Sequence, residues 1–176
     1  MIFTSTPLAG AYLIEPEPIS DERGFFARNY CRDEFTAKGL NPNLVQCNIS
    51  FNKVLGTLRG MHFQKAPYTE AKLVRCTQGS IYDVIIDLRP ESKTVKQWFG
   101  VELNAQNRSA LYVPADFAHG FITLQDNTEV LYHMSEFFHG ECAAGVRWND
   151  PAFAIKWPID VEVISGRDQH YQDFTL

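Results

Sequence analysis

Glycine and proline divide this sequence into short segments, and few of the segments could form helices. Turn residues recur at short intervals from Pro16 to Pro158. Between them lie runs rich in β-branched and aromatic residues, at 72–77, 81–88, 98–103, 110–113, 120–124 and 129–134. Many short strands separated by regular turns are typical of a β-sandwich or a closed β-barrel. The one helix that we predict covers residues 33–38 and ends at Gly39.

The segment 81–88 is the clearest strand, because its residue types alternate with a period of two. Its odd positions place Asp83 and Asp87 among isoleucines. Its even positions form a continuous apolar face of Tyr82, Val84, Ile86 and Leu88. The 176 residues show neither an internal repeat nor a linker. We therefore expect an all-β fold with a single domain over residues 1–176.

Charge and cysteine usage narrow the class of protein further. The net charge is −5 and the pI is about 5.5, so a broad basic face for nucleic acid is not expected. The four cysteines form no Cys-x-x-Cys pair, and we interpret them as free thiols in a reducing compartment. No stretch reaches the roughly 18 apolar residues that a membrane helix needs. We expect a cytoplasmic protein that contacts neither nucleic acid nor membrane.

The segment 56–64 contains an arginine and a histidine on either side of a glycine. On a regular strand, Arg59 and His62 would point to opposite faces. Both could face one cavity only if Gly60 bends or bulges the strand. Taken alone, the two residues are better explained as a surface arginine and a histidine with an ordinary hydrogen bond.

Three further polar residues lie in segments with strand character. Lys72 shares a face with apolar neighbours, so it either points into the barrel, where it would serve an anion, or reaches solvent at the strand end. His119 follows Pro114 between small residues and could cap a backbone group in a tight turn. Tyr132 fits an ordinary core tyrosine with one satisfied hydroxyl group.

Metal and nucleotide cofactors are not expected. Many small β-barrels hold a metal with a His-x-His pair, but the matching place here ends in Gln64 instead of a second histidine. The other histidines show no convincing ligand spacing. The chain also has no glycine-rich phosphate loop of the kind that binds NAD or ATP.

Taken together, these segments resemble the dTDP-4-dehydrorhamnose 3,5-epimerase family. The resemblance covers nearly the whole chain and rests on the order and spacing of many segments. The main ones are residues 21–26, 46–50, 56–64, 72–75, 79–84, 87–89, 114–121, 148–151, 157–158 and 165–168, with Tyr132. The resemblance implies a cupin-like β-barrel (jelly roll) with short peripheral helices, and a homodimer. The exposed first strand at residues 2–4 suggests that N-terminal strands pair with the partner's sheet.

The family's substrate is a nucleoside diphosphate that carries a 4-keto-6-deoxyhexose. The ketone acidifies the hydrogens on carbons 3 and 5, so epimerisation needs a base, an acid on the opposite face and a cation near the enolate oxygen. The resemblance implies that His62 is the base and Asp168 its partner. It implies that Tyr132 is the acid and that Lys72 stabilises the enolate. No cofactor is required by this chemistry.

The resemblance also implies which residues hold the substrate. Cationic and polar groups would contact the diphosphate and the sugar, because a guanidinium can donate two hydrogen bonds to a phosphate at once. An aromatic ring, from Phe25 or Phe26 and from Phe137, would stack on the base or line the sugar site. The implied substrate-binding residues are Arg23, Phe26, Gln46, Asn48, Arg59, His119 and Arg167.

One position departs from the family pattern. Family members that use dTDP commonly carry a glutamate where this chain has Arg28, so recognition of thymine is open and cytidine is an alternative. Two other activities stay open. The first is epimerisation at one carbon, or keto-isomerisation, on a CDP- or dTDP-linked sugar. The second is a cupin-like sugar-binding module without catalysis, which would have no need for His62, Tyr132 and Asp168 together.

Overall fold

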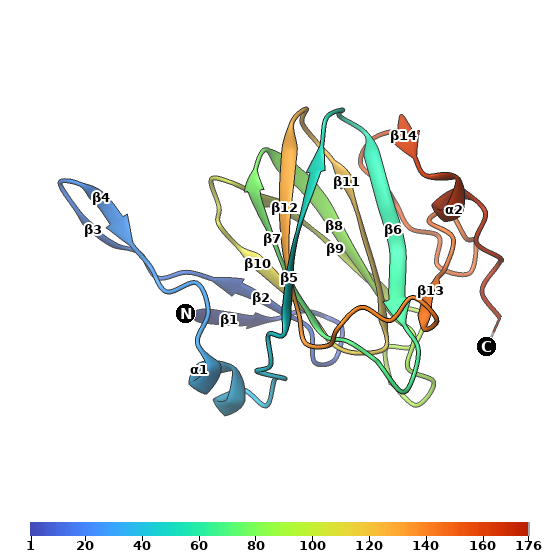
Figure 1. Ribbon diagram of the computed structural model, residues 1–176, viewed down its shortest axis with the longest axis horizontal. Coiled ribbons are helices and arrows are strands. Elements are labelled where there is room, and N and C mark those ends of the chain that lie inside the picture. The colour runs from blue at the N-terminus through green and yellow to red at the C-terminus, as the bar shows by residue number, and fades with distance from the viewer. Residues whose placement is uncertain (176) are drawn as a thin grey trace.

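Two sheets, antiparallel except for the parallel pair of β14 with β6, pack face to face in the computed structural model, which describes residues 1–175 (Figure 1). In spatial order, the first sheet contains β1 (Ile2–Ser5), β2 (Tyr12–Glu15), β10 (Ala110–Val113), β7 (Lys72–Gln78), β12 (Thr128–Met134) and β5 (Gln46–Asn52). The second contains β13 (Ala143–Gly145), β6 (Thr57–Gln64), β11 (Phe117–Thr123), β8 (Ser80–Asp87) and β9 (Trp98–Asn104), and β14 (Val163–Ile164) also pairs with β6. This is the cupin-like β-barrel that the family resemblance implies.

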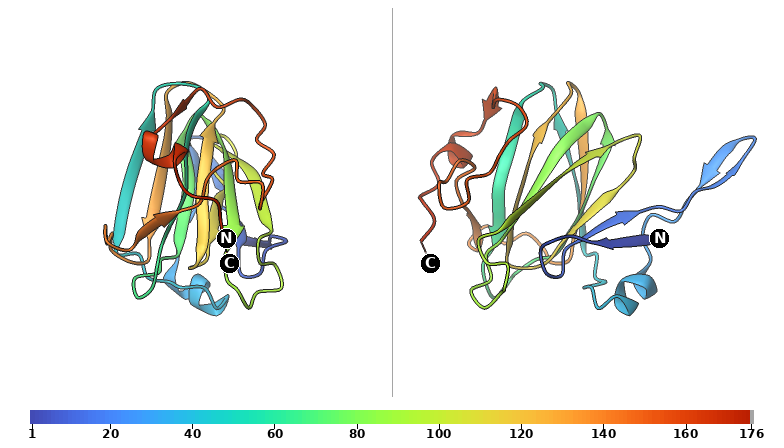
Figure 2. Two further views of the ribbon diagram at one scale, coloured as in Figure 1. Left: turned by 90° about the vertical axis from the view of Figure 1, so that its right-hand side faces the viewer. Right: turned by 180° about the vertical axis from the view of Figure 1, so that it is seen from behind.

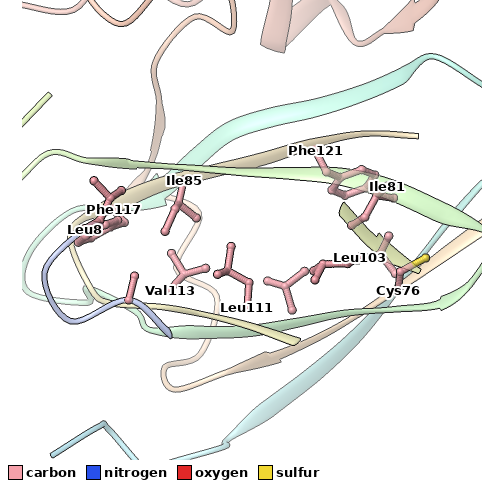
Figure 3. Packing of buried hydrophobic residues seen from close by; sticks show 12 residues of the cluster. Leu8, Cys76, Ile81, Ile85, Leu103, Leu111, Val113, Phe117 and Phe121 are labelled. Atoms are coloured by element: carbon pink, nitrogen blue, oxygen red, sulfur yellow. The ribbon is translucent and has the colours of Figure 1, made fainter. Parts of the chain in front are cut away.

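The core fills the space between the two sheets (Figure 3). Leu111 and Val113 from the first sheet meet Ile81, Ile85 and Leu103 from the second. The odd positions of β8 therefore face the barrel interior. The even positions, Val84 and Ile86 among them, pack on the outside against the C-terminal segment, including Phe153 and Trp157. Both faces of β8 are thus covered, and Asp83 lies on the interior one.

Two short helices lie outside the barrel. Helix α1 (Arg32–Ala37) agrees with the predicted helix to within one residue, and Gly39 follows it with a φ of +71°. Its buried Phe35 packs on the outer face of the first sheet against Ile14 and Leu73. Helix α2 (Gly166–Gln169) was not predicted, because four residues carry too weak a pattern. Within residues 1–175, no helix is long and apolar enough to cross a membrane.

A two-stranded hairpin projects away from the barrel (Figures 1 and 2). It consists of β3 (Ile19–Asp21) and β4 (Gly24–Phe26), which pair only with each other. Its apolar side chains are open to solvent: Ile19 is 73% exposed and Phe26 is 74% exposed. An isolated hairpin of this kind is marginally stable in water, so these side chains suit a contact with another surface.

Candidate active site

A cavity of about 470 Å³ opens between the two sheets at strands β5, β6, β11 and β12. It brings together most of the residues that the sequence singled out. Asp168 lies directly behind the wall of the cavity, hydrogen-bonded to one of the lining residues. The predicted residues that line the cavity are Gln46, Asn48, Arg59, His62, Lys72, His119, Tyr132 and Arg167.

A bulge in β6 turns Arg59 and His62 to the same side. In the pairing with β11, His62 lies opposite His119 and Arg59 lies opposite Phe121. Between these two pairs, β6 contains one more residue than β11. The extra residue falls at Gly60, whose φ is +143°. A Cβ atom there would lie 2.6 Å from the Cα of Gly120, so only glycine fits. The structure thus has the bulge at Gly60 that was the condition for Arg59 and His62 to share a cavity, and the interpretation of Arg59 and His62 as ordinary structural residues on opposite faces is wrong.

His62 and Asp168 form a hydrogen-bonded pair. His62 Nε2 lies 2.7 Å from Asp168 Oδ1, and the backbone N–H of Gly60 donates to Asp168 Oδ2 at 3.2 Å. The helix α2 places Asp168, since the Ser165 side chain accepts a hydrogen bond from the Asp168 N–H. Asp168 Oδ1 accepts a hydrogen bond from the Nε2–H of His62, which leaves Nδ1 of His62 as the proton acceptor.

Opposing effects act on this pair. Burial lowers the pKa of His62, and the Asp168 carboxylate opposes this shift only in part. Arg167, whose guanidinium lies 3.2 Å from His62 Nε2, lowers the pKa further. Burial alone would raise the pKa of Asp168, but its hydrogen bonds with His62 and Gly60 bring it below the usual value. At neutral pH, the pair is therefore a neutral imidazole beside a carboxylate.

A second histidine–carboxylate pair lies deeper in the barrel. His119 Nε2 is 2.7 Å from Asp83 Oδ1, and Asp83 is 0% exposed. His119 belongs to β11 and does not cap a turn. Asp83 was missed, although the alternation along 81–88 placed it on a face with Ile81 and Ile85. A carboxylate between two interior isoleucines is the signal that could have identified it.

Tyr132 lines the cavity from β12, and its ring is almost perpendicular to that of His119, with the ring centroids 6.0 Å apart. Burial raises the pKa of Tyr132 strongly, and the negative charge of Asp83 adds to the effect. A hydrogen bond with the Ser50 side chain opposes the shift without cancelling it. The hydroxyl group of Tyr132 thus keeps its proton at neutral pH and can donate it.

Lys72 points into the cavity, so the inward one of its two interpretations is confirmed. Its ammonium group donates to the backbone carbonyl of His62 at 3.1 Å. It also lies 3.0 Å from Glu70 Oε1, a residue that the sequence reasoning missed. The spacing of two residues puts Glu70 and Lys72 on one side of an extended chain, which is the signal that was available.

The polar groups at the mouth of the cavity hold one another in place. Arg59 Nε donates to Asn52 Oδ1 at 2.7 Å, and Gln46 Nε2 donates to Asn48 Oδ1 at 3.2 Å. Phe138 lines the cavity, whereas Phe137 does not. The prediction of Phe137 as a lining residue is corrected to its neighbour, because the loop after β12 turns the next side chain inward.

Gln64 fixes the loop after β12. Its side-chain oxygen accepts from the N–H of His139 at 2.6 Å, and its nitrogen donates to the carbonyls of Tyr68 and Phe137 at 3.0 and 3.1 Å. Gln64, which stands where a metal-binding barrel would have its second histidine, thus stabilises this loop. No group of three or more His, Cys, Asp or Glu side chains that could hold a metal ion occurs among residues 1–175.

Two predicted residues lie outside the cavity of their own chain. Arg23 lies at the turn of the projecting hairpin and pairs with Asp21, and Phe26 lies at the end of β4. Nothing in the local sequence could reveal the direction in which the hairpin points. Arg28 follows the hairpin and pairs with Glu34 of α1 at 2.6 Å.

Comparison with known proteins identifies the family of this chain. The model of the dTDP-4-dehydrorhamnose 3,5-epimerase family matches residues 5–175. The enzyme of that name from Methanothermobacter thermautotrophicus is 41% identical over 97% of this chain and 92% of its own. The crystal structure of the Elizabethkingia anophelis enzyme has 40% identity and a TM-score of 0.96, covering 99% of this chain and 96% of that one. The Bacillus anthracis enzyme, crystallised with TDP and PPi bound, has 41% identity and a TM-score of 0.94, covering 98% and 99%. The chain therefore belongs to the dTDP-4-dehydrorhamnose 3,5-epimerase family.

Proposed function

We propose that this protein epimerises carbons 3 and 5 of dTDP-4-dehydro-6-deoxyglucose to give dTDP-4-dehydrorhamnose. One observation carries the proposal: a neutral histidine with a carboxylate partner, a protonated tyrosine and an ammonium group all face one cavity. These are the base, the acid and the cation that inversion next to a ketone needs. The activity matches the name of the relatives that share about 40% of the sequence.

In the proposed reaction, His62 removes the proton from the carbon next to the ketone. The electron pair moves onto the ketone oxygen, and the resulting enolate is stabilised by the ammonium group of Lys72. Tyr132 then donates its proton to the same carbon from the opposite face, and the ketone reforms. Asp168 holds the imidazole in place and favours its charged form after the proton transfer. The ketone itself supplies the acidity, so the steps need no redox cofactor or metal.

The negative charge of the substrate's diphosphate is complementary to the arginines that line the cavity. Arg59 and Arg167 both line it, and their planar guanidinium groups can each donate two hydrogen bonds to a diphosphate. Gln46 and Asn48 would contact the sugar, and the ring of Phe138 would stack on the base. The four cysteines are free thiols, which fits the cytoplasm, where nucleotide-linked sugars are made and used.

A deuterium experiment tests the function and the nucleobase together. The protein is incubated in deuterated water with the dTDP-linked and, separately, the CDP-linked 4-keto-6-deoxyglucose, and the products are analysed by NMR. We expect inversion and deuterium at carbons 3 and 5 of the dTDP-linked sugar. Deuterium at carbon 3 alone would indicate an epimerase acting at a single carbon. Turnover of the CDP-linked sugar alone would show that Arg28 marks a change of base. No exchange with either sugar would contradict the proposal.

We further propose that the protein acts as a homodimer. The outer face of the first sheet is partly exposed to solvent. Ile49 is 66% exposed there, and Leu131 and Arg75 lie beside it on the next two strands. Arg75 is buried there, its Nε has no hydrogen-bond partner within residues 1–175, and burial lowers its pKa to about 10. A second copy would cover this face and satisfy the guanidinium. The projecting hairpin would then carry Arg23 and Phe26 to the partner's cavity. There the guanidinium group could contact the diphosphate, and the ring could stack on the base or line the sugar site.

We expect light scattering at micromolar concentration to give twice the chain mass of 20.1 kDa. Ile49→Lys should shift the mass toward one chain, because a charge would be buried on the covered face. Leu55→Lys is the matched control, since Leu55 is also exposed but lies in the loop between β5 and β6. A wild-type protein with the mass of one chain would contradict the dimer.

A further inference from the structure

Glu70 is a buried carboxylate in the wall of the cavity with no role in the steps above. It is 7% exposed and belongs to the segment between β6 and β7. The neighbouring backbone fixes its position: the N–H of Ala71 donates to Ser135 Oγ at 2.7 Å, and the N–H of Ser135 donates to the Ala71 carbonyl at 2.9 Å. These hydrogen bonds join Ala71, the residue between Glu70 and the start of β7, to the loop after β12.

The partner of Glu70 is the ammonium group of Lys72, 3.0 Å away. Both side chains are almost fully buried, and a buried ammonium group is strongly disfavoured unless an anion compensates it. Among the ion pairs of residues 1–175, Glu70 is the one carboxylate that contacts Lys72. The other two buried carboxylates of the site, Asp168 and Asp83, face His62 and His119.

The geometry also limits the direction of the ammonium group. An ammonium group has three N–H donors. One donates to the His62 carbonyl and another faces Glu70 Oε1, so a third is left for a ligand in the cavity. Lys72 is thereby fixed relative to His62, the residue that would remove the proton.

We propose that Glu70 is a positioning residue for this reaction: it holds the Lys72 ammonium group, charged and correctly directed, at the place where the enolate oxygen forms. This inference rests on the proposed function, because it assigns a task to Glu70 only if Lys72 stabilises an enolate. Glu70 acts through Lys72 and contacts neither the base nor the acid.

The expected effect lies in kcat and not in KM. A displacement of about 1 Å in a catalytic group can lower the rate about a hundredfold, and loss of one donor to an oxyanion costs about a hundred- to a thousandfold. Glu70→Gln keeps an acceptor oxygen but removes the charge, so we expect kcat to fall about tenfold. Glu70→Ala removes both, and we expect a fall of about a hundredfold. The KM should change less than threefold, because the arginines that hold the diphosphate are untouched.

A double-mutant cycle distinguishes positioning from general damage to the fold. The four proteins are the wild type, Glu70→Gln, Lys72→Met and the double variant, each assayed for kcat, KM and deuterium exchange. If Glu70 acts only through Lys72, then Glu70→Gln should have no further effect on kcat in the Lys72→Met background. Glu91→Gln is the matched control, because Glu91 is exposed and lies outside the cavity. Thermal unfolding of every variant shows whether it is folded. If Glu70→Ala does not fold, Glu70→Gln alone tests the role of Glu70.

The outcomes separate this inference from the proposed function. If Lys72→Met retains the wild-type kcat, the enolate role of Lys72 is wrong. If Lys72→Met is slow but Glu70→Gln has the wild-type kcat, only the role of Glu70 is wrong. Equal losses from Glu70→Gln with and without Lys72 would also overturn it, since Glu70 would then act independently.

Discussion

His62→Ala should abolish both solvent exchange and epimerisation, with a fall in kcat of about a hundred- to ten-thousandfold. The reason is that His62 lines the cavity with an imidazole that burial keeps neutral at pH 7 and that the Asp168 carboxylate orients at 2.7 Å. Without it, neither the hydrogen at carbon 3 nor the one at carbon 5 can leave. Deuterium incorporation and product formation, both followed by NMR, measure the two processes in one sample.

The pH dependence provides an independent check on the same residue. A base must be neutral to accept a proton, and burial places the pKa of His62 below its ordinary value of 6.5. We therefore expect kcat/KM to reach its full value at pH 7 and to fall only on the acid side of pH 6.5.

Asp168→Asn should slow both solvent exchange and epimerisation without unfolding the protein, because the imidazole loses its charged partner.

The matched control for these variants is His139→Ala. His139 stacks on Tyr68 at a centroid distance of 3.5 Å and does not line the cavity. The His139→Ala variant should exchange and epimerise at rates close to those of the wild type. Wild-type exchange in His62→Ala would show that another group removes the proton.

The general fold could be predicted from sequence because its signals are local. Turn residues and the period of two in segments such as 81–88 lie within a few residues of one another, and the all-β class followed from them. The same holds for the helix before Gly39. The second helix was missed because its ordering contact, Ser165 to the Asp168 N–H, spans a single short turn.

The site was predictable only in part, because its contacts are distant in sequence. His62 and Asp168 are separated by 106 residues, and no local pattern joins them. Asp83 contacts His119 and Glu70 contacts Lys72, and their positions in the local sequence could suggest a buried carboxylate but not which partner it meets. Arg23 and Phe26 lie on a hairpin that projects away from the cavity of its own chain, so their assignment to the site stays a prediction about a partner chain.

Tyr132→Phe should separate exchange from inversion. The change keeps the ring, and with it the contacts to His119 and Phe121, but removes the only O–H group at that position. Burial keeps the pKa of Tyr132 high, so in the wild type the hydroxyl group is protonated and ready to donate. In the variant, His62 can still remove a proton and return deuterium to the face from which it came. We expect inversion to fall about a hundredfold or more while exchange falls much less.

Tyr112→Phe is the control for this separation. Tyr112 is also a buried strand tyrosine, but it packs with Phe35 on the outer face of the first sheet, and its hydroxyl oxygen accepts from the N–H of Asn41. Its loss should affect stability by about 1 kcal/mol and leave the ratio of exchange to inversion unchanged. If Tyr132→Phe inverts the sugar at the wild-type rate, then Tyr132 is a core tyrosine and the proton comes from another donor. If exchange and inversion fall together, Tyr132 acts before the proton is removed, because a residue needed only for reprotonation cannot slow the abstraction step that both processes share.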